Sequence, residues 1–138
     1  YTIYGGNDSS KKIIDIILES TKMKKKLDLS PGEQVLDFIH IDDVTSFYLH
    51  LIKHKKKMPI KTNFKLGTGL GHNLKQVSSI LESISNKKTN INWGGIKYRQ
   101  SDVMYAVANL DEIKDKLTWK PKISLREGIK KIINNNKS

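Results

Sequence analysis

The segment of the sequence with the clearest chemical potential is Tyr98–Met104, where Arg99 stands three residues before Asp102. Arg99 and Arg126 are the only arginines in the chain. A guanidinium can grip a phosphate through paired hydrogen bonds, and a nearby carboxylate can accept hydrogen bonds from sugar hydroxyls. An ordinary surface ion pair between Arg99 and Asp102 would produce the same spacing. The residues alone leave both interpretations open.

A glycine-rich loop, Gly67–Gly71, follows an expected strand and precedes an expected helix. This is the setting of a dinucleotide-binding fingerprint. The spacing does not fit, because His72 stands where the third glycine belongs and no acidic residue closes a second strand about 20 residues later. We therefore interpret the loop as a tight turn between a strand and a helix, and we assign no cofactor-binding residue to the chain.

His40, Asp42 and Asp43 are residue types that bind metal ions. Acidic residues directly after a strand are more typical of helix caps, so we expect caps here and no metal site. The chain has no cysteine, which excludes disulfides, thiolate metal sites and cysteine nucleophiles. It also lacks a Gly-x-Ser-x-Gly nucleophile elbow.

Helices and strands must position these residues, and the hydrophobic periodicity of the sequence predicts a small mixed α/β unit of about five helices and short strands. Helices are expected over residues 10–26, 42–53, 73–85 and 110–117 and from 125 onward, and strands over 27–29, 34–41 and 63–66. The candidate N-caps are Asp8, Ser9 or Ser10, Asp42 or Asp43, and Ser124. No internal repeat or long linker occurs, so residues 1–138 are expected to form one segment.

The chain is strongly basic, with 25 Lys+Arg against 14 Asp+Glu and a net charge of +11. All but two of the basic residues are lysines, and their clusters lie at the ends of expected helices without interleaved aromatic residues. This pattern favours a solvated surface and makes a nucleic-acid partner unlikely. No apolar run approaches the ~20 residues needed to span a bilayer, and no targeting pattern opens the chain. We expect a cytoplasmic chain without a membrane partner.

Several stretches resemble, in order, the C-terminal half of NAD-dependent epimerase/dehydratases, which are extended short-chain dehydrogenase/reductases acting on nucleotide sugars. These stretches are Tyr4-Gly5, Gly32–Val44 and Phe64–Gly69. Two later stretches, Ile91–Met104 and Leu117–Ile129, are especially similar to the CDP-abequose synthase branch. That branch reduces a 4-keto-6-deoxyhexose on a nucleotide carrier. The resemblance implies the substrate-binding part of a Rossmann-type enzyme without the Rossmann domain itself.

The resemblance also implies roles for individual residues. Arg99 matches the arginine that contacts the nucleotide diphosphate, and Asp102 matches the acid that binds the ribose. Leu36 stands where many relatives carry a second phosphate-binding arginine. Leu27, Asp28 and Leu29 match a segment beside the base, and Gln34 lies on the strand edge leading from it. The implied substrate-binding residues are therefore Arg99, Asp102, Leu27, Asp28, Leu29 and Gln34.

Relatives catalyse their reactions with a Tyr-x-x-x-Lys pair, and no tyrosine of this chain has a lysine four residues later. We therefore expect no catalytic residue and no activity from the chain alone. NAD or NADP is implied for the intact enzyme, held by an N-terminal cofactor domain that would be a partner together with a nucleotide sugar. An apolar surface that meets this domain would favour homo-oligomers of the isolated chain. A basic nucleic-acid-binding domain and a non-catalytic assembly module remain alternatives.

Overall fold

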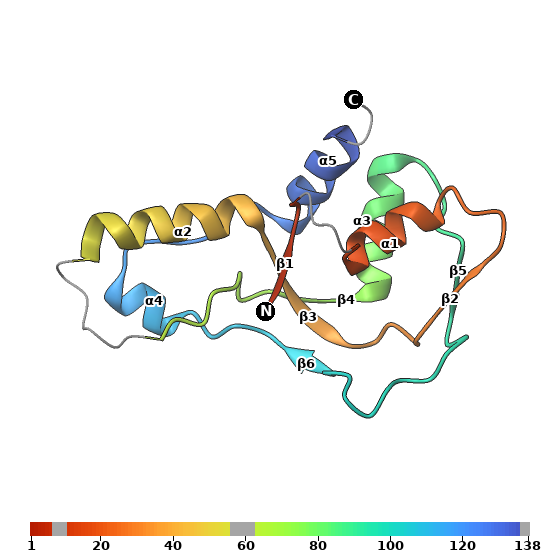
Figure 1. Cartoon of the computed structure of the whole chain (residues 1–138), viewed down its shortest axis with the longest axis horizontal. Helices are drawn as coiled ribbons and strands as arrows, with labels where there is room; N and C mark the ends of the chain where they lie inside the picture. The colour runs from red at the N-terminus through yellow and green to blue at the C-terminus, as the bar shows by residue number, and fades with distance from the viewer. Residues whose placement is uncertain (7–10, 56–62, 136–138) are drawn as a thin grey trace.

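The computed structural model describes residues 1–6, 11–55 and 63–135 (Figure 1). Its central element is strand β3 (Val35–His40), which pairs in parallel with β1 (Thr2–Tyr4) and with β6 (Tyr105–Ala106). Strand β4 (Gly71–Asn73) pairs with β3 in the antiparallel direction. A separate two-stranded parallel sheet joins β2 (Leu27–Leu29) to β5 (Ile91–Trp93). The strand predicted over 27–29 and most of the one predicted over 34–41 are thus confirmed.

Five helices surround β3 in the described part of the chain, and together with the strands they confirm the predicted mixed α/β unit. They are α1 (Ile13–Ser20), α2 (Ile41–His54), α3 (Leu74–Ser85), α4 (Asp111–Lys116) and α5 (Leu125–Asn135). In Figure 1, α1, α3 and α5 lie on one side of β3, and α2 and α4 extend to the other. Strand β3 therefore separates two groups of helices.

Two hydrophobic clusters follow from this arrangement, because successive side chains of a strand point to opposite faces. Phe38 packs into the cluster formed with α1, α3 and α5, whereas Ile39 packs into the cluster formed with α2 and α4. In the second cluster the Phe47 ring meets the edges of the Phe64 and Trp119 rings, with centroids 5.5 and 5.2 Å apart. The alternation of β3 thus distributes the core over both halves.

Three predicted details are wrong. Residues 63–66 form no strand, and their apolar side chains Phe64 and Leu66 instead pack against the second cluster. The first helix ends at Ser20 and not near residue 26, because the lysine-rich stretch that follows has no apolar face to bury. Asp42 and Asp43 do not cap α2: β3 runs directly into the helix, so the extended His40 is the N-cap, and its Nδ1 accepts a hydrogen bond from the Asp42 amide at 3.2 Å.

Of the other predicted helix caps, one is confirmed and the others are not tested. Ser124 caps α5, where its Oγ accepts from the Glu127 amide at 3.2 Å and Glu127 Oε2 accepts from the Ser124 amide at 2.9 Å. Asp8, Ser9 and Ser10 lie outside the described residues. Helix α1 begins after Lys12, whose amide donates to Asp15 Oδ2 at 3.1 Å.

The most connected polar group of the core is the carboxylate of Asp37, which is fully buried in β3. It accepts hydrogen bonds from the Thr68 amide at 2.8 Å, the Thr68 hydroxyl at 2.6 Å and the Gly69 amide at 2.8 Å. The Ala108 amide donates to its Oδ2 at 3.2 Å. A buried carboxylate is stable only when several donors replace its hydration. Asp37 therefore fixes two distant segments to the central strand.

A second close contact joins β1 to α5 through Tyr4. A Cβ on Gly128 would collide with the Tyr4 hydroxyl, so only glycine allows this approach of helix and strand. The ring also meets the buried His40 edge-on, with centroids 5.3 Å apart. Burial raises the pKa of Tyr4 far above its ordinary value, and the charges of Asp43 and Glu127 raise it further. The phenol is therefore a neutral packing group.

Replacing Asp37 with asparagine tests the buried carboxylate. We expect D37N to lower the free energy of unfolding by roughly 2–4 kcal/mol, because an amide NH₂ group would face donors that now bind an anion. Urea unfolding measures the loss. The exposed Asp111, which only approaches Lys114 at 3.9 Å, serves as the control, and D111N should change stability by less than about 0.5 kcal/mol. Equal effects of the two variants would contradict the assigned role.

Gly128→Ala tests the contact between β1 and α5. Helix propensity alone predicts that alanine stabilises this position by about 1 kcal/mol. We expect the opposite, a loss of roughly 1–3 kcal/mol, because the new methyl group overlaps the Tyr4 hydroxyl. Lys130→Ala on the exposed face of α5 is the matched control. Thermal unfolding that showed a more stable G128A variant would disprove the close approach.

Candidate functional site

The Arg99–Asp102 segment is a closed turn and not an ion pair. The Arg99 amide donates to Asp102 Oδ2 at 2.8 Å, and the Asp102 amide donates to the Arg99 carbonyl oxygen at 3.0 Å. Within the part of the chain that the structure describes, the Arg99 guanidinium makes no ion pair or hydrogen bond, and the residue is exposed. The surface ion pair left open by the sequence is therefore wrong, and the guanidinium is available to an anion.

The turn is held in place by its neighbour Tyr98. The Tyr98 hydroxyl accepts a hydrogen bond from the Glu33 amide at 2.9 Å, which ties the turn to the loop before β3. That loop reverses at Gly32, whose φ of +74° is a left-handed conformation that favours glycine. The Trp93 ring packs on Gly32 so closely that a Cβ there would lie 2.6 Å from the ring carbons. Two aromatic side chains thus fix the approach to Gln34.

Tyr98 and Trp93 are positioning residues that reasoning from the sequence missed. Their contacts join residues 65 and 61 positions apart along the chain, so no local periodicity predicts them. The one signal available is their place beside Arg99 and at the end of a short strand, in a chain with only two tryptophans.

The segment Leu27–Leu29, predicted to lie beside the base, is strand β2. Its ends Leu27 and Leu29 are half-buried, and Asp28 is exposed. The Asp28 carboxylate accepts a hydrogen bond from the Asn92 amide group at 2.7 Å, and it lies over Gly95, where a Cβ would collide with it. Asp28 therefore supports the turn after β5.

Gln34 directly precedes β3 and is half-buried. Its Oε1 is buried without a hydrogen-bond partner in the described structure. Such an acceptor is costly unless another group reaches it. Gln34 is therefore a polar group whose partner is still to be supplied.

The six predicted residues lie on three segments that backbone hydrogen bonds join. The Leu29 carbonyl oxygen accepts from the amides of Gly94 at 2.9 Å and Ile96 at 3.3 Å, which links β2 to the segment that leads to Arg99. The Val35 amide donates to the Met104 carbonyl oxygen at 2.9 Å, which links β3 to the far end of that segment. Among the described residues, no hydrogen bond or ion pair joins the Arg99 guanidinium to Leu27, Asp28, Leu29 or Gln34. The structure gathers their segments without closing a pocket around them.

The glycine-rich loop does not fit a dinucleotide. The Thr68 and Gly69 amides, which would have to bind phosphate oxygens, already donate to the Asp37 carboxylate. Strand β4 lies between the loop and α3, so the loop amides do not open that helix. The loop is a structural turn as predicted, but within the described residues it follows no strand and does not lead directly into a helix.

His40, Asp42 and Asp43 each have a structural partner of their own. Asp43 accepts from the amides of Lys122 and Ile123 at 3.0 and 2.9 Å, which fixes the segment before α5. A hydrogen bond from Lys131 lowers the pKa of Asp42, and burial lowers the pKa of His40. No group of three or more possible metal ligands occurs in the described ranges.

A cavity of about 400 Å³ lies away from the predicted residues. It is lined by Phe38, Leu70, Ile80 and Ile123 and edged by His72 and Arg126. The Arg126 guanidinium at this edge donates a hydrogen bond to Ser83 Oγ at 2.8 Å. Of the two arginines, only Arg99 has a guanidinium without a hydrogen-bond or ion-pair partner in the described structure.

Comparison with known proteins agrees with the predicted family. Residues 1–67 match the model of the NAD dependent epimerase/dehydratase family. The CDP-abequose synthase of Salmonella typhimurium is 31% identical over 134 residues, which cover 95% of this chain and 44% of that protein. A UDP-glucose 4-epimerase of Rhizobium leguminosarum bv. trifolii is 30% identical over 99 residues, 72% of this chain and 30% of that protein. The chain thus spans less than half the length of these relatives.

Solved structures show the same fold at low identity. The UDP-glucuronic acid 4-epimerase of Bacillus cereus, in complex with UDP-4-deoxy-4-fluoro-glucuronic acid and NAD, superposes with a TM-score of 0.85 at 22% identity, over 99% of this chain and 43% of that one. The UDP-glucose 4-epimerase of Thermotoga maritima, solved with UDP-glucose, gives 0.77 at 23% identity, over 99% and 45%. These structures show the fold, and the matched family model together with the 31% identity to CDP-abequose synthase shows that the chain belongs to the NAD-dependent epimerase/dehydratase family and corresponds to its C-terminal part.

Proposed function

We propose that this chain is the substrate-binding part of a nucleotide-sugar enzyme and that it binds the nucleoside diphosphate of the sugar nucleotide. The observation that carries the proposal is the Arg99 guanidinium, which is exposed and unpaired in the described structure on a turn fixed from both sides. A guanidinium that is free of partners and projects from a held backbone turn can bind phosphate oxygens in the bidentate manner for which its planar shape is suited. The names of the relatives, which include CDP-sugar and UDP-sugar enzymes, support this class of ligand.

The neighbouring residues complete the proposed site. Asp102 uses Oδ2 to close the turn, which leaves its other oxygen to accept from a ribose hydroxyl. The unpartnered Oε1 of Gln34 is an acceptor that an N–H group on the edge of the base would satisfy. The half-buried Leu27 and Leu29 would cover the face of that base. Leu36, which replaces the second phosphate-binding arginine of many relatives, carries no charge, so Arg99 would provide most of the phosphate recognition.

We propose that the reaction itself depends on a cofactor-binding part outside this chain. If the intact protein resembles the CDP-abequose synthase branch in its activity, this reaction would be the reduction of a 4-keto-6-deoxyhexose. The contribution of this chain is to hold the nucleotide so that the sugar meets the reacting groups, because binding energy from a remote part of the substrate orients the reacting part.

Exposed apolar side chains mark the surface that this second part would cover. Tyr48, Leu49 and Ile52 lie on α2 and are more than half exposed, and Tyr1 and Ile3 are exposed at β1. Among the described strands, β1 pairs only with β3. The three residues of α2 share one face of the helix, and an exposed apolar face of this kind favours burial against a partner.

Arg99→Ala tests the phosphate contact. Calorimetric titration with CDP, UDP, GDP and dTDP should show that the variant binds the preferred nucleotide about 1–3 kcal/mol more weakly than the unmodified chain, the cost of losing a charge-assisted hydrogen bond. Arg126→Ala, which removes the other arginine, should bind with unchanged affinity. Unchanged binding by R99A, or an equal loss in both variants, would remove Arg99 from the site. Salt-sensitive binding of duplex DNA without nucleotide binding would instead support a nucleic-acid-binding domain.

Leu49→Lys and Ile52→Lys test the apolar surface of α2. The isolated chain should self-associate in sedimentation velocity at high concentration, and the double variant should shift the distribution toward the monomer because it places two charges on the contact surface. Ser79→Lys, an exposed position on the separate helix α3, should leave the association unchanged. A chain that is already monomeric throughout the concentration series would refute this surface.

A further inference from the structure

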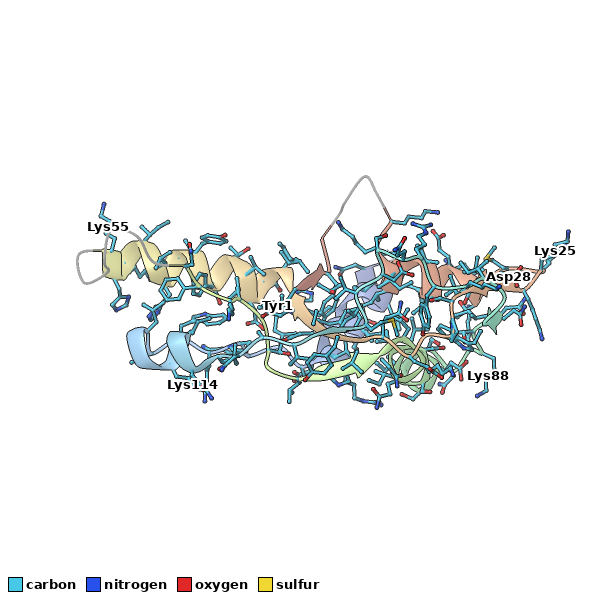
Figure 2. All side chains as sticks on the ribbon, turned by 90° about the horizontal axis from the view of Figure 1, so that it is seen from below. Tyr1, Lys25, Asp28, Lys55, Lys88 and Lys114 are labelled. Carbon is cyan, nitrogen blue, oxygen red and sulfur yellow. The ribbon has the colours of Figure 1, made fainter. Side chains whose placement is uncertain are left out.

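One end of the molecule carries a dense group of lysines from two distant segments. The end is formed by the loop after α1 and the loop after α3. Figure 2 shows Lys25 and Lys88 at this end, and Lys55 and Lys114 at the opposite end. We call the group the lysine tip, and its members are Lys22, Lys24, Lys25, Lys26, Lys87 and Lys88. The sequence places the two clusters at the ends of separate helices, and the fold brings them together.

Backbone contacts hold the two loops side by side. The Leu27 amide donates to the Asn90 carbonyl oxygen at 2.8 Å, and the Asn90 side-chain amide donates to the Met23 carbonyl oxygen at 2.9 Å. The parallel pairing of β2 with β5 begins directly after these contacts, with Leu27 opposite Ile91. The lysines therefore project from a fixed framework.

The positive charge of the tip is almost unmatched. All six lysines are exposed, and only Lys88 makes an ion pair in the described structure, with Glu82 at 2.8 Å. The nearby Glu19 is paired with Lys11 at 2.7 Å, and Asp28 is engaged with Asn92. Helices α1 and α3 both end here, and their negative dipole ends favour cations only within the last turn. None of the six lysines lies in the last turn of either helix, so helix termini do not account for the group.

An apolar side chain lies among these charges. Met23 is 44% exposed between Lys22 and Lys24, and its carbonyl oxygen is held by Asn90. An exposed apolar residue surrounded by lysines is typical of surfaces that rest on a bilayer, where the apolar group enters the headgroup region and the cations meet anionic lipids.

The composition of the tip favours a lipid surface over a nucleic acid. Both arginines, which would read bases or stack on them, lie elsewhere in the chain. Residues 22–26 and 87–88 contain no aromatic side chain on which a base could stack. Lysines need no particular geometry to meet a field of anionic headgroups.

We propose that the lysine tip attaches this protein to the surface of an anionic phospholipid bilayer, with Met23 entering the headgroup region. No helix within the described ranges is long and apolar enough to cross a membrane, a finding that bears on spanning and not on surface attachment. The proposal revises the expectation of no membrane partner, which rested on the lack of a spanning segment. It is independent of the nucleotide site, because the tip shares no residue with it.

Vesicle flotation of the full chain tests the proposal. The chain should float with vesicles of 70% phosphatidylcholine and 30% phosphatidylglycerol at low salt, and not with pure phosphatidylcholine vesicles. Each lysine near an anionic surface strengthens binding about fivefold, so Lys24→Gln, Lys25→Gln and Lys26→Gln together should weaken the partition coefficient roughly 100-fold. Met23→Gln should weaken it roughly fivefold while leaving the charge unchanged.

The matched control removes three lysines from the opposite end. Lys53→Gln, Lys55→Gln and Lys114→Gln change the net charge equally and should weaken vesicle binding far less than the tip variant. Equal weakening in the two triple variants would overturn the proposal, because general charge would then explain the binding. Absence of flotation at low salt, or tip-dependent binding of duplex DNA without vesicle binding, would also overturn it.

Discussion

The rest of the structure depends on the buried carboxylate of Asp37. It lies in the central strand, and its hydrogen-bond donors come from the loop at Thr68 and Gly69 and from Ala108. The donors are backbone amides and one hydroxyl, so the carboxylate fixes the course of the chain at both places. The segment that ends at Ala108 also carries the Arg99 turn, so this hydrogen bond anchors one end of that segment to β3.

The candidate site lies near the start of the same strand, where aromatic side chains hold the preceding loop. The loop before β3 is held by Trp93 on Gly32 and by Tyr98 on the Glu33 amide. These contacts leave Gln34 at the entrance of the strand with an unpartnered carbonyl oxygen. The Gln34 oxygen and the exposed Arg99 guanidinium thus lack partners within the described structure, and under the proposed function a bound nucleotide would supply both.

Much of the secondary structure could be predicted from the sequence. The amphipathic patterns of α2 and α3 are long and regular, and the short apolar run of β3, which the structure buries on both faces, is enough to identify the strand. The strand predicted over 63–66 was wrong, because the apolar side chains of Phe64 and Leu66 pack against the second hydrophobic cluster while their backbone pairs with no described strand. The short strands β4 and β6 have two or three residues each, too few for a period to show.

The residues of the candidate site are a prediction from the sequence, and their geometry could not be predicted from it. Family resemblance selected Arg99 and Asp102, yet the spacing alone left a surface ion pair equally acceptable. Only the fold shows that Asp102 binds the Arg99 backbone and leaves the guanidinium free. The role of Asp37 and the joining of two lysine clusters at one end both depend on contacts between residues more than 30 positions apart, which local sequence patterns do not encode.

The most direct test of the central claim is a two-dimensional ¹⁵N–¹H NMR titration of the chain with the nucleoside diphosphate that binds best. If the chain is a nucleotide-binding part positioned as described, the amide shifts will concentrate at residues 27–34 and 98–102, and those of the lysine tip and α2 will stay in place. Shifts that gather elsewhere, or none at millimolar nucleotide, would contradict the account.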